Sequence, residues 1–228
     1  YSQYLTPHKV VGSLSYKLEY AQKMAATTFS VYYSGYNAGN FSYRYGNDFN
    51  GDGVTSDLIY IPKDPSEIKF VDLKVGGVTY TAQEQVNAFF RYVNQDKYLS
   101  KHKGQYAERN GAYFPWYNRF DIKLLQDFKI MVKGQKNVIQ ISADLLNAGN
   151  AASTVLRHFG VLDGADWGIY KNLTVSNGAI LRSATPVNNV PTYTMSYVNG
   201  KLPVETFTNS LTTSSVFGLQ LGLRYIFN

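Results

Sequence analysis

Hydrophobic and polar residues alternate one by one along several separate stretches of the chain. The first stretch spans residues 8–20, with the sequence HKVVGSLSYKLEY. Side chains at every second position lie on the same face of a β-strand, so this stretch predicts a strand with one apolar and one polar face. The apolar face would carry Val10, Gly12, Leu14, Tyr16, Leu18 and Tyr20. The predicted strand is about twice as long as the usual strand of a soluble protein.

The same alternation recurs four times, in segments that are far apart in the chain. It predicts further strands at about 25–37, 116–130, 137–148 and 215–227. In the last segment, Phe217, Leu219, Leu221, Leu223, Tyr225 and Phe227 share one face, whereas Gly218, Gln220, Gly222 and Arg224 share the other. The sequence therefore predicts an all-β chain with about five long antiparallel strands.

The connections between these strands differ greatly in length. Tight turns of about four or five residues are expected near Gln22 and Gly134, whereas segments 38–115 and 149–214 are long. Long connections are uncommon in compact domains but routine for the extracellular loops of outer-membrane β-barrels. One-faced strands also occur in soluble β-sandwiches. Strand length and turn asymmetry favour the membrane barrel, and a soluble β-sandwich binding module remains the alternative.

A helix is predicted inside the first long connection, where the sequence reads TAQEQVNAFFRYVNQ. Thr81 and Glu84 have the spacing of a capping box, in which each side chain accepts a hydrogen bond from the other residue's backbone amide. The apolar residues that follow recur at helical spacing: Ala82, Val86, Phe89 and Val93. We expect a short helix packed on the loop.

Composition excludes several classes of chemistry. The chain has no cysteine, which rules out disulfides, thiolate nucleophiles and cysteine-bound zinc. The three histidines, His8, His102 and His158, are not at metal-ligand spacing. No carboxylate pair beside a base and no nucleophile motif is present, so we expect no enzymatic activity. No signal peptide opens the chain and no apolar run reaches the ~18 residues of a membrane helix.

Charge and aromatic content bear on the partners. The net charge of +6 is mild and spread along the chain, so no nucleic-acid partner is expected. The 20 tyrosines and 13 phenylalanines give an aromatic density that is typical of a β protein at a membrane interface.

The stretch GNDFNGDGVTSDLIYIP, residues 46–62, begins like an EF-hand calcium loop. Counting from Asp48, however, the twelfth position is Ile59 rather than glutamate, and no helix pattern flanks the loop. An EF-hand is therefore excluded. Four side chains still offer hard oxygen ligands to a structural calcium ion: Asp48, Asn50, Asp52 and Asp57. The alternative is a loop of Asn-Gly and Asp-Gly turns that folds without a metal.

The last strand carries the most specific motif. In QLGLRYIF, a polar residue is followed by a glycine and two aromatic residues: Gln220, Gly222, Tyr225 and Phe227. This order resembles the β-signal by which the outer-membrane assembly machinery recognises the last strand of its clients.

Several longer segments carry a resemblance to a known family: NDFNGDGVTSDLIYIP, QDKYLSKHKGQYAERNGAYFPWYNRFDIKLLQDF, ISADLLNAGNAAS, DWGIY and LQLGLRYIFN. Together they resemble the C-terminal part of a TonB-dependent outer-membrane transporter of the Bacteroidota, of the Oar-like branch related to SusC-like importers. The resemblance implies a bacterial outer-membrane barrel of about 22 strands with an N-terminal plug. This chain would supply about five strands and two extracellular loops, without the plug or the segment that binds TonB.

The resemblance also implies a function and a set of partners. The function is TonB-dependent uptake of a nutrient, such as a glycan, a peptide or a metal chelate. The partners are outer-membrane lipid, the remaining barrel and plug, the TonB complex and the barrel assembly machinery. SusC-like importers also pair with a surface lipoprotein lid, and the sequence leaves open whether this protein does. A structural or surface-interaction barrel without active transport is the alternative, and a plug in the full polypeptide would argue against it.

Aromatic side chains are the candidates for contact with a ligand: Tyr106, Tyr113, Phe114, Trp116 and Trp167. Aromatic rings stack on sugars and on peptide side chains, but they also form the girdle at the membrane interface. For Trp116 and Trp167, which are beside strand ends, the girdle is the preferred interpretation.

Overall fold

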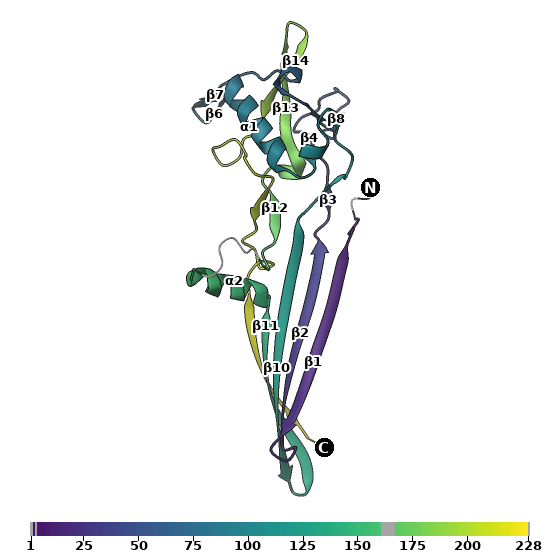
Figure 1. The fold of residues 1–228 in the computed structure, drawn as a ribbon, viewed down its shortest axis with the longest axis vertical. Coiled ribbons are helices and arrows are strands. Elements are labelled where there is room, and N and C mark those ends of the chain that lie inside the picture. Colours follow the sequence, from purple (N-terminus) through teal and green to yellow (C-terminus); the bar gives the residue numbers. More distant parts are fainter. Residues whose placement is uncertain (1, 3, 161–166, 228) are drawn as a thin grey trace. The chain divides into compact units, whose positions relative to one another are not determined.

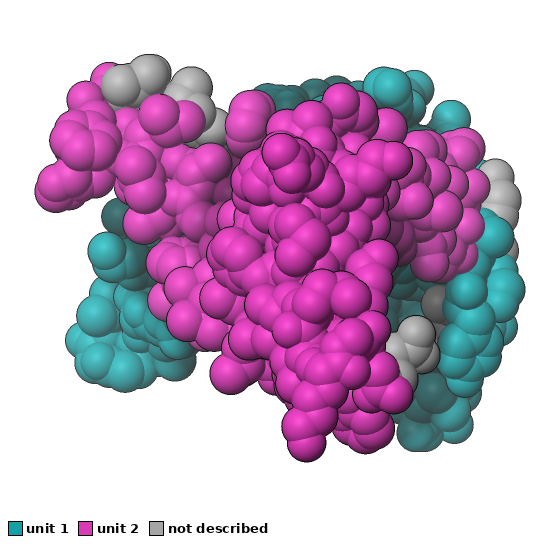
Figure 2. All heavy atoms as spheres, turned by 90° about the horizontal axis from the view of Figure 1, so that it is seen from below, with its two compact units in different colours: residues 1–5, 38–114, 171–208 teal, residues 6–37, 115–170, 209–228 magenta. Residues whose placement is uncertain are grey.

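The computed structural model describes residues 2, 4–160 and 167–227. The described chain forms two compact units, which are coloured separately in Figure 2. Unit 1 comprises residues 1–5, 38–114 and 171–208, and unit 2 comprises residues 6–37, 115–170 and 209–228. Most of the regular structure is β, and the sheets are mainly antiparallel. None of the helices in the described part of the chain is long and apolar enough to span a bilayer.

Unit 2 is built on one five-stranded antiparallel sheet (Figure 1). Its strands, in spatial order, are β1 (Lys9–Tyr20), β2 (Ala25–Asn37), β10 (Trp116–Val132), β11 (Gln135–Leu146) and β16 (Gly218–Ile226). All five strands that the alternating pattern predicts are present. The largest difference in bounds is at the start of β16, which was expected at residue 215 and begins at Gly218.

The register of this sheet places most apolar residues of the five strands on one face. One row of cross-strand partners runs through Leu14, Val31, Ile122, Leu145 and Leu219. The next row runs through Ser15, Ser30, Lys123, Asp144 and Gln220. Residues directly opposite each other project from the same face, and successive residues project from opposite faces. The alternation in each strand therefore becomes one aliphatic face and one polar face.

The two tight turns lie at one end of the sheet. Residues 21–24 join β1 to β2, and Lys133 and Gly134 join β10 to β11 with φ values of 51° and 80°. Positive φ at both central residues is the signature of a type I′ turn, whose twist matches that of the strands. This turn has only two residues, fewer than the four or five that the sequence analysis expects.

The long connections leave from the opposite end of the sheet. Asn37, where β2 ends, pairs with Trp116, where β10 begins. Leu146 and Gly218, the corresponding ends of β11 and β16, also pair. Short turns at one end and long connections at the other are the asymmetry that the sequence predicts.

Helix α2 (Ala148–His158) in unit 2 was not predicted, because the sequence analysis assigned its residues to the end of a strand and a loop at 149–214. It follows Asn147, whose φ of 53° ends the strand and turns the chain. The helix packs against β10 through small residues, and a Cβ on Gly149 would lie 3.5 Å from the Phe120 ring. Small residues give little periodic signal, which explains the miss. Residues 161–166 of the predicted loop lie outside the described residues.

Unit 1 is formed by the long connections, which fold around a core of their own rather than remaining open loops. Helix α1 (Ala82–Gln95) begins at the predicted capping box of Thr81 and Glu84. Among the residues of unit 1 that the structure describes, eight short strands form four pairs: β3 (Asn40–Phe41) with β9 (Ala112–Tyr113), β5 (Tyr60–Ile61) with β8 (Gln105–Tyr106), β6 (Leu73–Val75) with β7 (Val78–Tyr80), and β12 (Lys171–Leu173) with β15 (Phe207–Asn209). A three-stranded sheet has the order β14 (Val190–Met195), β13 (Ala179–Val187) and β4 (Arg44–Tyr45). Short 3₁₀ helices span Pro65–Glu67, Leu99–Lys101 and Ser176–Gly178.

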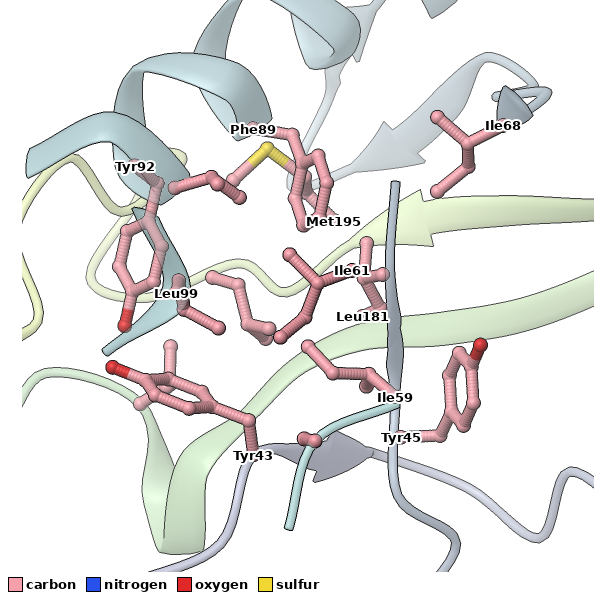
Figure 3. Close-up of a cluster of buried hydrophobic side chains, with 14 of the residues drawn as sticks. Tyr43, Tyr45, Ile59, Ile61, Ile68, Phe89, Tyr92, Leu99, Leu181 and Met195 are labelled. Carbon is pink, nitrogen blue, oxygen red and sulfur yellow. The ribbon is translucent and has the colours of Figure 1, made fainter. Parts of the chain in front are cut away.

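The core of unit 1 brings together residues from distant parts of the chain. Figure 3 shows Phe89 and Tyr92 of α1 beside Tyr43, Leu181 and Met195. All five side chains are almost fully buried, with at most 1% of their surface exposed. The predicted helix therefore packs on a hydrophobic core and not merely on a loop.

Candidate functional site

The apolar face of the unit 2 sheet is exposed over its whole width. Leu14 on β1 is 75% exposed, and Leu221 and Leu223 on β16 are 72% and 78% exposed. Phe29, Leu124 and Ile141, on the three strands between, are also exposed. A monomeric soluble protein rarely presents so continuous an apolar surface, which marks a site of contact with lipid or with another protein.

The opposite face carries the ion pairs of the sheet. Glu19 accepts a hydrogen bond from Lys129 Nζ at 2.9 Å, and Asp144 lies 3.1 Å from Lys123 Nζ. Arg119 and Asp121 form a third pair near the end with the long connections, at 3.0 Å. Such exposed pairs contribute little to stability in water. Their restriction to one face does separate a hydrophilic surface from an apolar one.

Both outer strands present an open edge. Among the described residues, β1 pairs only with β2, and β16 pairs only with β11. An unpaired strand edge exposes backbone N–H and C=O groups that can hydrogen-bond to a further strand. The sheet is therefore able to extend on both sides.

The four residues of the predicted β-signal lie on or just after β16. Gln220 and Gly222 belong to the polar face, whereas Tyr225 lies in the apolar rows and donates a hydrogen bond to Asn137 Oδ1 at 2.9 Å. Gly222 faces Ser142, and a Cβ on it would come within 2.5 Å of the Ser142 hydroxyl. Phe227 follows the strand and is 77% exposed. Recognition by the assembly machinery remains a prediction.

The five candidate aromatic residues are divided between the two units. In unit 1, Tyr106 is 69% exposed and contacts Tyr60, whereas Phe114 packs edge-on against Phe41 in the core, with ring centroids 5.3 Å apart. Tyr113 is exposed on β9. Phe114 is partly buried against the core and also lines a cavity of about 630 Å³, so its contact with a ligand remains a prediction.

The other two candidates belong to unit 2. Trp116 begins β10 at the sheet end with the long connections and donates a hydrogen bond to Asn118 Oδ1 at 2.9 Å. Trp167 is half exposed, and its Cβ lies 3.5 Å from where a Cβ on Gly149 would stand. Their position at one end of the strands is compatible with the girdle interpretation, which remains a prediction.

The 48–57 loop closes through bonds between its carboxylates and its own backbone. Asp48 accepts hydrogen bonds from the amides of Gly51 and Gly53 at 2.7 and 2.8 Å. Asp57 accepts from the amides of Phe49 and Asn50 at 2.8 and 3.3 Å. Two Asx turns lie between them, in which the amides of Asp52 and Val54 donate to the side chains of Asn50 and Asp52 at 3.0 and 2.8 Å. The loop is thus held by hydrogen bonds within the chain.

The pKa of Asp48 reflects these bonds. The amide of Gly53, followed by those of Gly51 and Asp52, holds the pKa of Asp48 below its usual value. The contribution of Asp48 to loop stability is therefore present above its unfolded pKa of about 3.9 and is lost as the pH falls through the lower folded value.

A structural calcium ion at this loop remains a prediction. Among the described residues, no three His, Cys, Asp or Glu side chains gather closely enough to hold a metal. If an ion binds through the carboxylate, amide and backbone oxygens of the loop, millimolar calcium should slow hydrogen–deuterium exchange in a peptide covering residues 46–57.

Replacing Asp48 by alanine should open the same loop. The amides of Gly51 and Gly53 would lose their acceptor, so we expect severalfold faster hydrogen–deuterium exchange in the peptide covering residues 46–57 at neutral pH. Asp64→Ala is the control, because Asp64 caps a separate turn in the same unit. Unchanged exchange in Asp48→Ala would mean that the glycine turns alone hold the loop.

Comparisons with models of protein families, with curated proteins and with solved structures found no match to this chain. The family resemblance described from the sequence therefore has no independent support from these comparisons. What the structure adds is physical: a two-faced sheet with open edges, and a second unit with a cavity that the sequence analysis did not anticipate.

Proposed function

We propose that this chain forms part of the wall and extracellular loops of a bacterial outer-membrane β-barrel that takes up a nutrient. The single observation that carries the proposal is the exposed aliphatic face shared by all five strands of unit 2. The sequence resemblance adds how uptake would be driven, namely from the inner membrane through the TonB complex.

Lipid is the partner that best explains the exposed face. Full burial of a leucine or isoleucine is worth about 1.5–3 kcal/mol relative to exposure to water, so a whole sheet face left in water would be strongly unfavourable. Membrane β-strands alternate in this way, with apolar side chains toward lipid and polar ones toward a wet interior. A soluble β-sandwich would need a second sheet over the apolar face, and in the described chain Leu14, Leu219 and Leu223 remain 65–78% exposed.

Strand length supports the same proposal. Crossing a bilayer takes about 9–11 residues of a tilted strand. The strands β1, β2, β10, β11 and β16 have 12, 13, 17, 12 and 9 residues. All five are long enough to cross.

The open edges argue that more strands complete the structure. Each unsatisfied backbone group in hydrocarbon costs several kcal/mol, which is why membrane-spanning sheets close into barrels. Strands that pair with β1 and β16 would remove that cost. The remaining barrel and its plug are therefore proposed as partners, together with the assembly machinery that inserts the strands and, as in related importers, a surface lipoprotein lid. No catalytic activity is proposed.

The transport role can be tested in the native bacterium. Deleting the gene for the full-length protein should abolish growth on a particular nutrient when this nutrient is scarce, and inactivating TonB should abolish growth on the same nutrient. Fractionation should place the protein in the outer membrane. A protein in that membrane whose deletion alters the cell surface, while uptake stays normal, would favour the structural alternative. A protein found only in soluble fractions would refute the barrel.

A further inference from the structure

A cavity of about 470 Å³ lies within unit 1, between β4, the 46–55 segment, residues 174–179 and the ends of β13 and β14. Its volume falls within the range of small-molecule sites, about 300–1,000 Å³. Two arginines, Arg44 and Arg182, line it. Neither residue was singled out by the sequence, because they come from strands more than 100 positions apart in the chain and meet only in the folded unit.

Neutral backbone carbonyl groups hold both arginines in place. Arg44 donates from Nε to the Asn177 carbonyl oxygen at 3.2 Å and from Nη1 to the carbonyl oxygen of Thr55. Arg182 donates from Nη1 to the Gly46 carbonyl oxygen at 3.0 Å. A guanidinium has five N–H donors, so most donors of each group remain available to a ligand.

Among the described residues, no carboxylate forms an ion pair with either arginine, and no Asp or Glu lines the cavity. Asp48 and Asp57 of the nearby loop accept hydrogen bonds from the loop's own amides and form no ion pair with either arginine. A positively charged cavity with polar walls favours an anion.

The rest of the wall is rich in hydroxyl groups, which come from Thr55, Thr174, Ser176, Ser196 and Tyr197. Thr174 Oγ1 is buried and has no hydrogen-bond partner in the part of the chain that the structure describes. Buried polar atoms are normally paired, so such an atom beside a cavity is explained by a partner from outside the chain. The wall is therefore suited to a ligand that carries hydrogen-bonding groups as well as a negative charge.

We propose that this cavity binds the carboxylate of a small ligand between Arg44 and Arg182. The planar guanidinium matches a carboxylate through two parallel hydrogen bonds, and the hydroxyl groups would bind the polar groups beside it. The proposal deepens the function above and rests on it for the identity of the ligand as an imported nutrient. A sugar acid and the C-terminus of a short peptide carry the same carboxylate chemistry.

The test measures binding to the purified full-length protein in detergent by calorimetry. The probes are trigalacturonate and N-acetyl-trialanine, each with a neutral counterpart, α-1,4-galactotriose and N-acetyl-trialanine amide. At least one acid should bind, and its neutral counterpart should bind at least about tenfold more weakly. The acid that binds identifies the source of the carboxylate. Affinity should also fall as salt is added, because part of the cavity wall is exposed.

Two variants connect binding to the cavity. Arg182→Gln should weaken binding of the acid at least about tenfold, whereas Arg91→Gln, on the exposed side of α1, should leave it unchanged. Ser176→Glu should also weaken binding, because it places a carboxylate in the wall at an exposed position that tolerates a larger side chain. If Arg182→Gln does not fold, the binding of the acid by Ser176→Glu tests whether the ligand occupies this cavity.

Several results would overturn the assignment: no binding of either acid, equal binding of acid and neutral probe, or tight binding that survives both cavity variants. Binding of inorganic sulfate or phosphate, but of neither acid, would overturn the carboxylate assignment too. Failure here is distinguishable from failure of the transport proposal, because fractionation and TonB dependence do not depend on the charge of the ligand.

Discussion

Replacing Leu14 by arginine should strongly reduce the amount of the full-length protein that assembles in the outer membrane. Leu14 lies near the middle of β1, is 75% exposed and belongs to the aliphatic row that crosses the sheet. If this face meets lipid, an arginine near the middle of the bilayer costs about 2–4 kcal/mol. The measurement is the folded, heat-modifiable fraction of the protein in purified outer membranes.

Ser13→Arg is the matched control, because the neighbouring residue on the same strand projects from the polar face. A charge there would meet water inside a barrel, so the folded fraction should stay close to that of the wild type. Equal effects of the two substitutions would contradict the lipid assignment. If the sheet belonged to a soluble protein, Leu14→Arg would change stability little and would improve solubility, because the leucine is already exposed to water.

The second large effect is expected in unit 1, from replacing Asp96 by alanine. The carboxylate of Asp96 is 6% exposed and accepts four hydrogen bonds. Tyr43 and Thr206 donate their hydroxyls to Oδ2 at 2.7 and 2.8 Å, and the amides of Tyr98 and Leu99 donate to Oδ1 at 2.9 and 2.8 Å. Alanine would leave these buried donors without their acceptor, at a cost of about 3 kcal/mol to the free energy of opening of unit 1.

Hydrogen–deuterium exchange of peptides from α1 measures that cost, since their opening energy reports on the unit rather than on the whole protein. Burial raises the pKa of the Tyr43 hydroxyl, so this group stays protonated and keeps donating to Asp96 at any pH in ordinary use. Asp64→Ala, at an exposed cap, should have a much smaller effect on α1. Protection of α1 that survives in Asp96→Ala would show that the apolar contacts of Phe89 and Val93 hold the helix unaided.

The sheet of unit 2 was predictable because the residues of each strand show the alternating pattern by themselves. Each strand alternates with a period of two, and the pairing register then follows from keeping the aliphatic residues on one face. Helix α1 was predictable for a similar reason, since the capping box of Thr81 and Glu84 and the apolar residues at helical spacing all lie within one segment. The tight turns were expected from their positions between alternating runs.

Unit 1 was not predictable as a folded body. Its core joins Tyr45 of the two-residue strand β4 to Leu181 and Met195 of β13 and β14, which come much later in the chain. A strand of two residues has no measurable periodicity, and its partner is set by tertiary packing rather than by its own sequence. The cavity lined by Arg44 and Arg182 was not predicted for the same reason, since its walls come from segments that meet only in the folded unit. The calcium prediction rested on the spacing of oxygen ligands alone, a pattern that hydrogen-bonded turns share.

The contact between Gly222 and Ser142 has a consequence for how the last strand finds its place. The Ser142 hydroxyl fills the space that a side chain at position 222 would need. Sliding β16 along β11 by one residue would turn its leucines to the polar face. Sliding by two would preserve the faces but bring Gln220 or Arg224 against Ser142, whose hydroxyl would have to rotate away from its present position. Gly222 therefore favours the observed register, because it leaves the Ser142 hydroxyl in place whereas the neighbouring residues of that face would displace it.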